Sequence, residues 1–293
     1  MSATNGFHIS RTMLARAWVV LILLLSVLCL AALIVLGILA LTAPEKPNTD
    51  AYEPPFEEEY PVYDPDAPAD PDDAGLAAHS RILPQTADAG QGYIDRMIFV
   101  GESTTAHLRS RGVLSGGTKT QQVWSNDSNT MTLDLNILKK TIRYPVSGVE
   151  MTIPEAVASA KPEYIVLSFG LNGINGFERN ADLYKAAYGM LIDAIHAASP
   201  TTVVLLQTVY PVADNQTTFA EGAAVLNGYV RKLNELLPII AEEHDAYVVD
   251  TASCLADVQG LLRADYQNGD GLHLTHAAYH AILNYLRTHA YAP

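Results

Sequence analysis

Residues 97–108 read MIFVGESTTAHL, an apolar run that stops at Gly101-Glu102-Ser103 and continues in a helical pattern. A serine at the start of a helix that follows a strand has an exposed hydroxyl and a free main-chain N–H, because the first turn of a helix leaves its donors unpaired. Serine and small residues also cap helices that have no catalytic role. The stretch therefore fits either a turn or a serine nucleophile, and the second interpretation requires an acid and a histidine elsewhere in the chain.

Short runs of apolar and β-branched residues predict the strands. They are RMIFV (96–100), TQQVW (120–124), YIVLSF (164–169), TVVLLQT (202–208) and AYVVD (246–250). The first, third and fourth are nearly continuous in apolar character, as expected for parallel strands that are covered on both faces. Helical patterns lie between and after them, at 152–160, 181–198, 223–244 and 275–290. Strands that alternate with helices predict an α/β fold, in which a mainly parallel five-stranded sheet carries helices on both faces.

A polar segment follows the third predicted strand. In sheets of this kind the chemistry lies beyond the carboxyl ends of the strands, which directs attention to LSFGLNGING (167–176). The side-chain amide of Asn172 can donate a hydrogen bond to a developing oxyanion, as side-chain donors do in acyl-transfer sites. Taken alone, the Asn172-Gly173 pair fits a simple turn better.

A second polar segment precedes the last predicted helix. The stretch NGDGLHLTHAAYH (268–280) places Asp270 and His273 three residues apart. In such a loop the carboxylate can fix the tautomer and orientation of the imidazole, and the imidazole can accept a serine proton. The alternative is a turn at Asp270-Gly271 with His273 at the entry to the helix.

The last predicted helix also carries His276 and His280, one helical turn apart. This spacing can hold a metal, but neither a carboxylate nor a third histidine is placed to complete the site. We interpret the pair as part of a solvated helix face, and we expect neither a metal nor another cofactor.

Together these loops supply a nucleophile, a base, an orienting acid and an oxyanion donor, which are the parts of an acyl-transfer site. Residues 93–293 resemble the SGNH/GDSL hydrolases in three blocks. Gly101-Glu102-Ser103 is similar to the GDS block, with Glu102 in place of the usual Asp. GLNG (170–173) resembles the GxND block, with a glycine where an Asp often stands, and DGLHLT (270–275) matches the closing DxxH block.

The resemblance implies a flavodoxin-like three-layer sandwich and a Ser103 nucleophile. The family's second block supplies a glycine whose N–H completes the oxyanion hole. The best candidate here is Asn129 in VWSNDSNTMTL (123–133), since Asn tolerates the left-handed backbone that glycine would use. The predicted catalytic residues are Ser103, Asp270 and His273. The predicted oxyanion hole consists of the Ser103 N–H, the Asn172 amide and the Asn129 N–H.

The N-terminal part contains 28 residues without a charge, from Ala17 to Pro44. About 20 apolar residues suffice to cross a bilayer as a helix, whereas the apolar region of a cleaved signal peptide has about 7–15. The length favours an uncleaved transmembrane helix at 17–43, with a cleaved signal peptide as the alternative. Arginines without acids precede this span, so residues 1–16 are predicted to be cytoplasmic and the C-terminal part extracytoplasmic.

Residues 44–84 hold nine of the sixteen prolines and eleven acidic residues. Such a stretch cannot bury enough apolar surface to offset its ordering entropy, so it is predicted to be a disordered linker. It leads to a domain at 85–293 with 14 basic and 21 acidic residues, a net charge of −7. That balance argues against a nucleic-acid partner, and the single cysteine of the domain, Cys254, excludes an internal disulfide.

These observations predict a serine esterase anchored in the cell membrane of a Gram-positive bacterium by one helix, with wall or capsule glycans in reach. The resemblance implies that O-acetyl or other short acyl groups on cell-surface carbohydrate are among many conceivable ester substrates. One alternative is an acyltransferase that moves acyl groups onto surface glycans and receives them from a multi-pass membrane partner. Another alternative, of a different class, is a surface glycan-binding protein with an inert triad.

Overall fold

The structure is a computed structural model that describes residues 81–292 of the chain. The predicted cytoplasmic segment at 1–16, the predicted transmembrane helix at 17–43 and the predicted linker as far as residue 80 lie outside the described residues. Within residues 81–292, none of the helices combines the length and the apolar character that crossing a bilayer requires.

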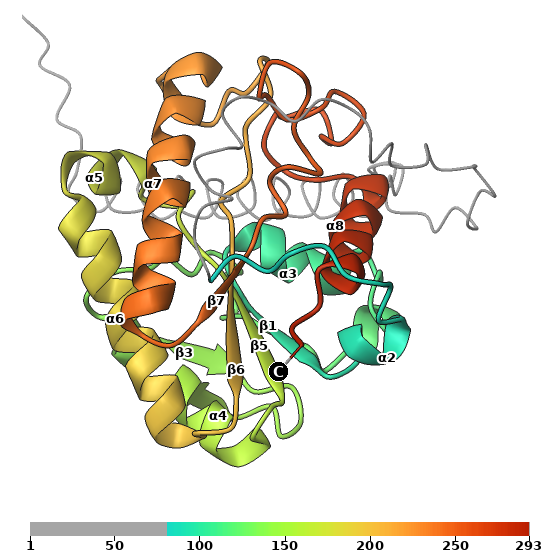
Figure 1. Cartoon of the computed structure of the whole chain (residues 1–293), viewed down its shortest axis with the longest axis vertical. Coiled ribbons are helices and arrows are strands. Elements are labelled where there is room, and N and C mark those ends of the chain that lie inside the picture. Colours follow the sequence, from blue (N-terminus) through green and yellow to red (C-terminus); the bar gives the residue numbers. More distant parts are fainter. Residues whose placement is uncertain (1–80, 293) are drawn as a thin grey trace, which may run out of the picture. The chain divides into compact units, whose positions relative to one another are not determined.

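The centre of the domain is a five-stranded sheet in which every neighbouring pair of strands is parallel (Figure 1). The strands lie in the order β2-β1-β5-β6-β7. This is the flavodoxin-like order, in which the second strand of the chain lies at one edge beside the first. The strands are β1 (Met97–Gly101), β2 (Val123–Trp124), β5 (Tyr164–Ser168), β6 (Val203–Gln207) and β7 (Tyr247–Val249). Four lie within a run that the sequence predicts, and β1 extends one residue beyond its run, to Gly101. The predicted parallel sheet is confirmed.

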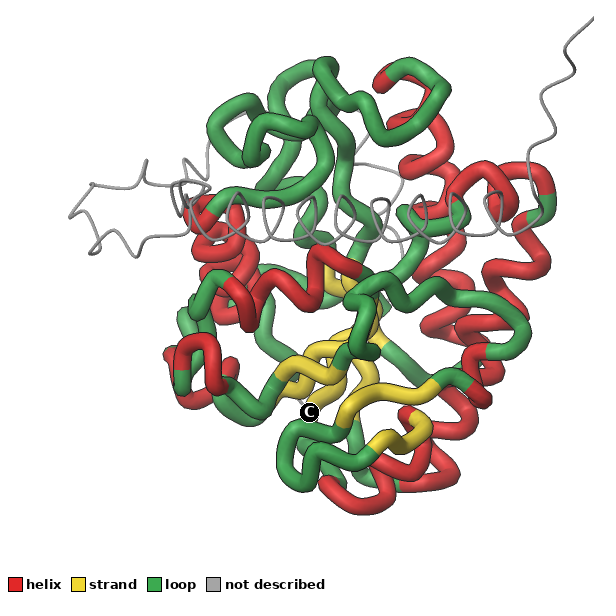
Figure 2. The backbone as a smooth tube through the Cα atoms, turned by 180° about the vertical axis from the view of Figure 1, so that it is seen from behind, coloured by secondary structure: helices red, strands yellow, loops and turns green. Residues whose placement is uncertain are grey.

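Helices cover both faces of the sheet and complete a three-layer sandwich (Figures 1 and 2). Successive strand residues pack alternately into two cores: Phe99 and Val166 on one face, Val100 and Leu167 on the other. Because both faces are buried, the strands are apolar throughout. One face carries α2 (Gln91–Ile94), α3 (Ser103–Ser110) and α8 (His276–Thr288), and the other carries α4 (Ile153–Ala160), α5 (Ile174–Arg179), α6 (Ala181–Ala198) and α7 (Ala223–Glu243).

A small insertion separates β2 from α4. It contains an antiparallel pair, β3 (Thr141–Arg143) and β4 (Glu150–Thr152), which the sequence analysis does not predict. The α4 helix then begins at a capping box: the Thr152 hydroxyl accepts the Glu155 N–H, and the Glu155 carboxylate accepts the Thr152 N–H. Such a cap satisfies donors that a helix start leaves unpaired.

The fold includes residues just before the predicted domain start at 85. Ile82 forms a parallel bridge with Val248 of β7. The Val248 N–H donates to the Arg81 carbonyl at 2.8 Å, and the Leu83 N–H donates to the Val248 carbonyl at 2.9 Å. Residues 81–83, assigned to the linker from composition, therefore belong to the sheet, because their backbone groups pair with β7.

Candidate active site

The nucleophile segment depends on a glycine at the end of β1. A Cβ on Gly101 would lie 2.3 Å from the Ser168 carbonyl oxygen and 2.4 Å from the Thr105 hydroxyl oxygen. Only glycine therefore allows the ends of β1 and β5 to approach this closely. The chain passes through Glu102 and enters α3 at Ser103. Ser103 is partly exposed at the carboxyl edge of the sheet, and its N–H is among the helix donors without an intrahelical partner.

The predicted nucleophile, base and acid come together at this edge. The Ser103 Oγ lies 3.0 Å from the His273 Nε2. The His273 Nδ1 lies 2.7 Å from the Asp270 Oδ2. The order of contacts, hydroxyl to imidazole to carboxylate, is the one that nucleophilic catalysis by serine requires. Ser103 is 170 residues from His273 in the sequence, so the fold alone creates this contact.

Asp270 is held as an anion that orients His273. Its Oδ1 accepts the main-chain N–H groups of Leu272 and His273, both at 2.8 Å. Burial acts to raise the pKa of Asp270, but the hydrogen bonds from the His273 side chain and from these two N–H groups outweigh burial and lower it. A carboxylate at Nδ1 favours the tautomer with the proton on Nδ1, which leaves Nε2 free to accept the Ser103 proton.

The loop that carries Asp270 packs against the connection between β6 and α7. Gly271 has φ 74°, and a Cβ on it would lie 2.5 Å from the backbone of Gln216. Its carbonyl accepts the Ala213 N–H at 2.9 Å. Since a side chain at Gly271 would displace the loop, this glycine contributes to the position of Asp270 and His273.

Glu102 connects the nucleophile segment to the loop after β5. The residue is 4% exposed, and its carboxylate accepts the N–H of Gly170 at 2.8 Å and that of Asn172 at 3.0 Å. Burial raises the pKa of Glu102 to about 7, against the opposing effect of the backbone hydrogen bonds. Although Glu102 is one methylene longer than the Asp of the GDS block, its carboxylate reaches these two main-chain N–H groups.

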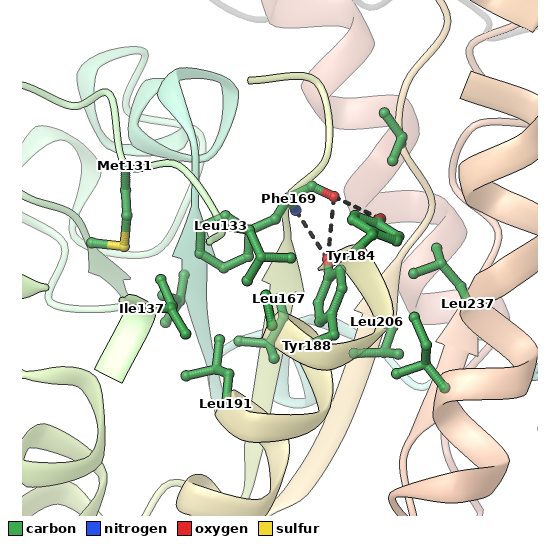
Figure 3. Packing of buried hydrophobic residues seen from close by; sticks show 14 of the residues in the cluster. Met131, Leu133, Ile137, Leu167, Phe169, Tyr184, Tyr188, Leu191, Leu206 and Leu237 are labelled. Atoms are coloured by element: carbon green, nitrogen blue, oxygen red, sulfur yellow. Dashed lines mark hydrogen bonds between the residues drawn. The ribbon is translucent and has the colours of Figure 1, made fainter. Parts of the chain in front are cut away.

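The predicted oxyanion donor Asn172 lies on a well-supported loop. Two tyrosines of α6, Tyr184 and Tyr188, donate to the carbonyl of Phe169 at 3.0 and 3.2 Å, and the Phe169 N–H donates to Tyr188 at 3.2 Å (Figure 3). These bonds fix the backbone where β5 ends. The side-chain amide of Asn172 is partly buried and donates to the Met131 carbonyl at 3.4 Å, a long contact that leaves the amide with donor capacity.

The structure gives less support to the second predicted main-chain donor. Asn129 has the left-handed backbone expected of it, with φ 53°. However, its N–H donates to the carbonyl of Asn126 at 3.1 Å, and its side-chain oxygen accepts the Ser125 hydroxyl at 2.9 Å. The N–H is thus used in a local turn, and the oxyanion role of Asn129 stays a prediction that this geometry does not favour.

Two further histidines, His107 and His276, have different contacts: the ring of the first lies beside His273, and the second contacts a main-chain carbonyl. His107, which the sequence analysis does not single out, lies with its ring centroid 4.9 Å from that of His273. Its position four residues after Ser103 is the signal that could have identified it, since such residues share a helix face.

His276 places its Nε2 2.7 Å from the Arg111 carbonyl. Within residues 81–292, no three His, Cys, Asp or Glu side chains are grouped to hold a metal.

Comparison with known proteins identifies related sequences and folds. The sequence profile of the GDSL-like lipase/acylhydrolase family matches residues 99–281. A Streptococcus pneumonia protein provisionally named a platelet activating factor is 17% identical with a TM-score of 0.48, over 74% of this chain and 89% of that one. A carbohydrate esterase family 3 structure from Talaromyces cellulolyticus is 15% identical with a TM-score of 0.43, over 65% and 93% of the two chains. A GDSL-like lipase from Bacteroides thetaiotaomicron is 16% identical with a TM-score of 0.43, over 72% and 90%. No curated protein matches the chain.

Proposed function

The chain belongs to the GDSL-like lipase/acylhydrolase family and is a serine esterase, and we propose that it removes acetyl or other short acyl groups from cell-surface carbohydrate by a Ser-His-Asp mechanism. The observation that carries the mechanism is the continuous series of hydrogen bonds from Ser103 through His273 to Asp270, with distances of 3.0 and 2.7 Å. Both distances lie in the range that proton transfer between positioned groups requires.

The reaction proceeds in two halves. The Ser103 Oγ attacks the ester carbonyl carbon while His273 takes the hydroxyl proton, and Asp270 stabilises the imidazolium that forms. The negative charge moves to the carbonyl oxygen, where the Ser103 N–H and the Asn172 amide donate to it. The C–O bond to the alcohol then breaks, His273 returns the proton to the leaving oxygen, and an acyl-serine remains. Water then attacks the acyl-serine carbonyl carbon while His273 takes one of its protons. The bond from that carbon to the Ser103 Oγ breaks, His273 returns the proton to Oγ, and the acid is released.

The proposed substrate follows from the proposed location. A domain that is tethered outside a bacterial membrane faces polysaccharide, and the O-acetyl groups of sugars are short esters within reach of such an enzyme. Fold and catalytic residues do not select a substrate, so the substrate is tested directly. The full-length protein is incubated with purified wall polysaccharide and, separately, with a long-chain ester of equal concentration. Faster release of acetate supports the proposal, and faster release of the long-chain acid overturns it.

A further inference from the structure

The base of the site rests against a second histidine. Ser103 and His107 lie one helical turn apart on α3, so both side chains project from the same face of that helix. His273 reaches this face from the loop before α8. Its ring lies with the centroid 4.9 Å from that of His107, and the two planes are inclined by 48°. His107 is itself partly buried. The spacing lies within the range of aromatic rings in contact.

Hydrogen bonds alone do not fix the ring of His273. One bond holds Nδ1 to Asp270 and the other holds Nε2 to Ser103. The second bond is broken when Ser103 gives up its proton and is acylated, and rotation about the Cα–Cβ and Cβ–Cγ bonds of His273 can then change the tilt of the ring. The His273 side chain is 25% exposed, so solvent borders part of it. A ring in contact from the side would restrict this movement, and His107 makes such a contact.

We propose that His107 is a positioning residue, whose ring sets the tilt of the His273 imidazole between Ser103 and the leaving group. This proposal rests on the proposed function, in which His273 is the base. The Nε2 must take a proton from the Ser103 Oγ and then give it to a different oxygen beside it. A ring with a fixed tilt can reach both oxygens, and small displacements in such steps can cost up to about 10²-fold in rate.

The proposal concerns the flat ring of His107 rather than its hydrogen-bonding atoms, and this difference makes it testable. Phenylalanine keeps an aromatic face of similar width and has no nitrogen. Glutamine keeps polar atoms and has no ring. All variants are assayed at the same pH.

The experiment uses the full-length protein and the variants His107→Phe, His107→Gln and His107→Ala, with 4-nitrophenyl acetate as substrate. We expect His107→Phe to keep kcat within about threefold and the other two to lose about tenfold or more, with KM little changed, because orientation acts on the chemical step. The low-field proton NMR signal of the His273 Nδ1–H should stay sharp in His107→Phe and broaden in His107→Gln.

A matched control is His280→Ala, which removes one ring of another histidine pair. His276 and His280 lie with centroids 5.2 Å apart on α8, and His280→Ala should leave both kcat and the low-field signal unchanged. The proposal is overturned if His107→Phe is as slow as His107→Ala, or if His107→Gln keeps full activity. If the parent protein is folded but hydrolyses no ester, the proposed function fails. The NMR comparison of the Phe and Gln variants then still decides whether His107 positions the ring.

Discussion

Both carboxylate oxygens of Glu102 accept the main-chain N–H of Asn172, each at 3.0 Å. Glu102 directly precedes Ser103, the proposed nucleophile, and Asn172 carries the side-chain amide that we assign to the oxyanion. A single buried side chain therefore joins the two segments that must act on one substrate carbonyl. The position of the oxyanion donor relative to the nucleophile depends on this contact.

Replacing either of the central residues should abolish catalysis. We expect Ser103→Ala and His273→Ala each to lower kcat by about 10³-fold or more, because the attacking hydroxyl or its base is lost. A serine-directed fluorophosphonate should label the parent protein, fail to label Ser103→Ala and label His273→Ala far more slowly. Hydrolysis of a small acetyl ester by Ser103→Ala at the parent rate would show that the nucleophile lies elsewhere.

Replacing Glu102 should reduce activity without touching the triad. In the parent protein the Glu102 carboxylate accepts main-chain N–H groups, whereas in Glu102→Gln a side-chain NH2 group can face these donors. We therefore expect kcat to fall by about tenfold or more. Glu102→Asp should retain more activity than Glu102→Gln because it keeps the charge and both acceptors. Glu163→Gln is a suitable control, since Glu163 is 48% exposed and pairs with Arg96 on the surface. Equal activity of Glu102→Gln and the parent would contradict the positioning role.

Glu102 should also make stability depend on pH. Its pKa is raised in the folded state from 4.5 to about 7, so the folded protein binds this proton more tightly than the unfolded chain. The stabilisation is complete below pH 4.5 and is lost as the pH rises through about 7. Between pH 5 and pH 8 the loss amounts to about 2–3 kcal/mol of unfolding free energy.

Urea unfolding of the parent and of Glu102→Gln at both pH values measures this contribution. Other titrating groups, including Asp270 with its lowered pKa, act in both proteins and cancel in the difference. The parent should lose more stability than Glu102→Gln on going from pH 5 to pH 8. Equal losses in the two proteins would mean that burial does not raise the pKa of Glu102.

The two asparagines assigned to the oxyanion hole should differ in effect. Asn172→Ala removes a side-chain donor, so we expect kcat to fall by roughly 10²–10³-fold with KM near the parent value. Asn129→Gly keeps the main-chain N–H and suits the left-handed φ of 53°, so we expect near-parent activity. Steady-state kinetics on one small ester compares them. A loss at Asn129→Gly as large as that at Asn172→Ala would point to a role for the Asn129 side chain.

The sequence allowed the sheet and the Asp270–His273 pair to be predicted because their signals are local. Continuous apolar runs mark strands that are buried on both faces, and Asp270 and His273 lie in one loop. The β3–β4 pair was missed because its strands have three residues each and mostly exposed or half-buried side chains. Its apolar content is too low to stand out from a loop.

Contacts between distant segments could not be predicted in the same way. His107 looks like an ordinary helix residue until the fold brings it to His273. The partners of the Glu102 carboxylate are main-chain N–H groups of the loop after β5. Every residue except proline has such a group, so the residue types do not indicate these partners. For Asn129 the predicted backbone conformation is present, yet the use of its N–H depends on the Asn126 carbonyl, which is a matter of loop geometry alone.

The parallel bridge between Ile82 and Val248 has a practical consequence for handling the enzyme. A chain that runs parallel to β7 enters from the amino-terminal side of the sheet, where Arg81 pairs with Asp245. Tyr291, near the C-terminus, lies on the same side, with its ring centroid 4.8 Å from that of Tyr247. Ser103 and His273 lie at the other end of the strands, beyond their carboxyl ends. A bead, fusion partner or surface linked through residue 81 or residue 292 would be attached on the side of the domain away from Ser103 and His273. An enzyme immobilised in this way would leave the site open to large polymers.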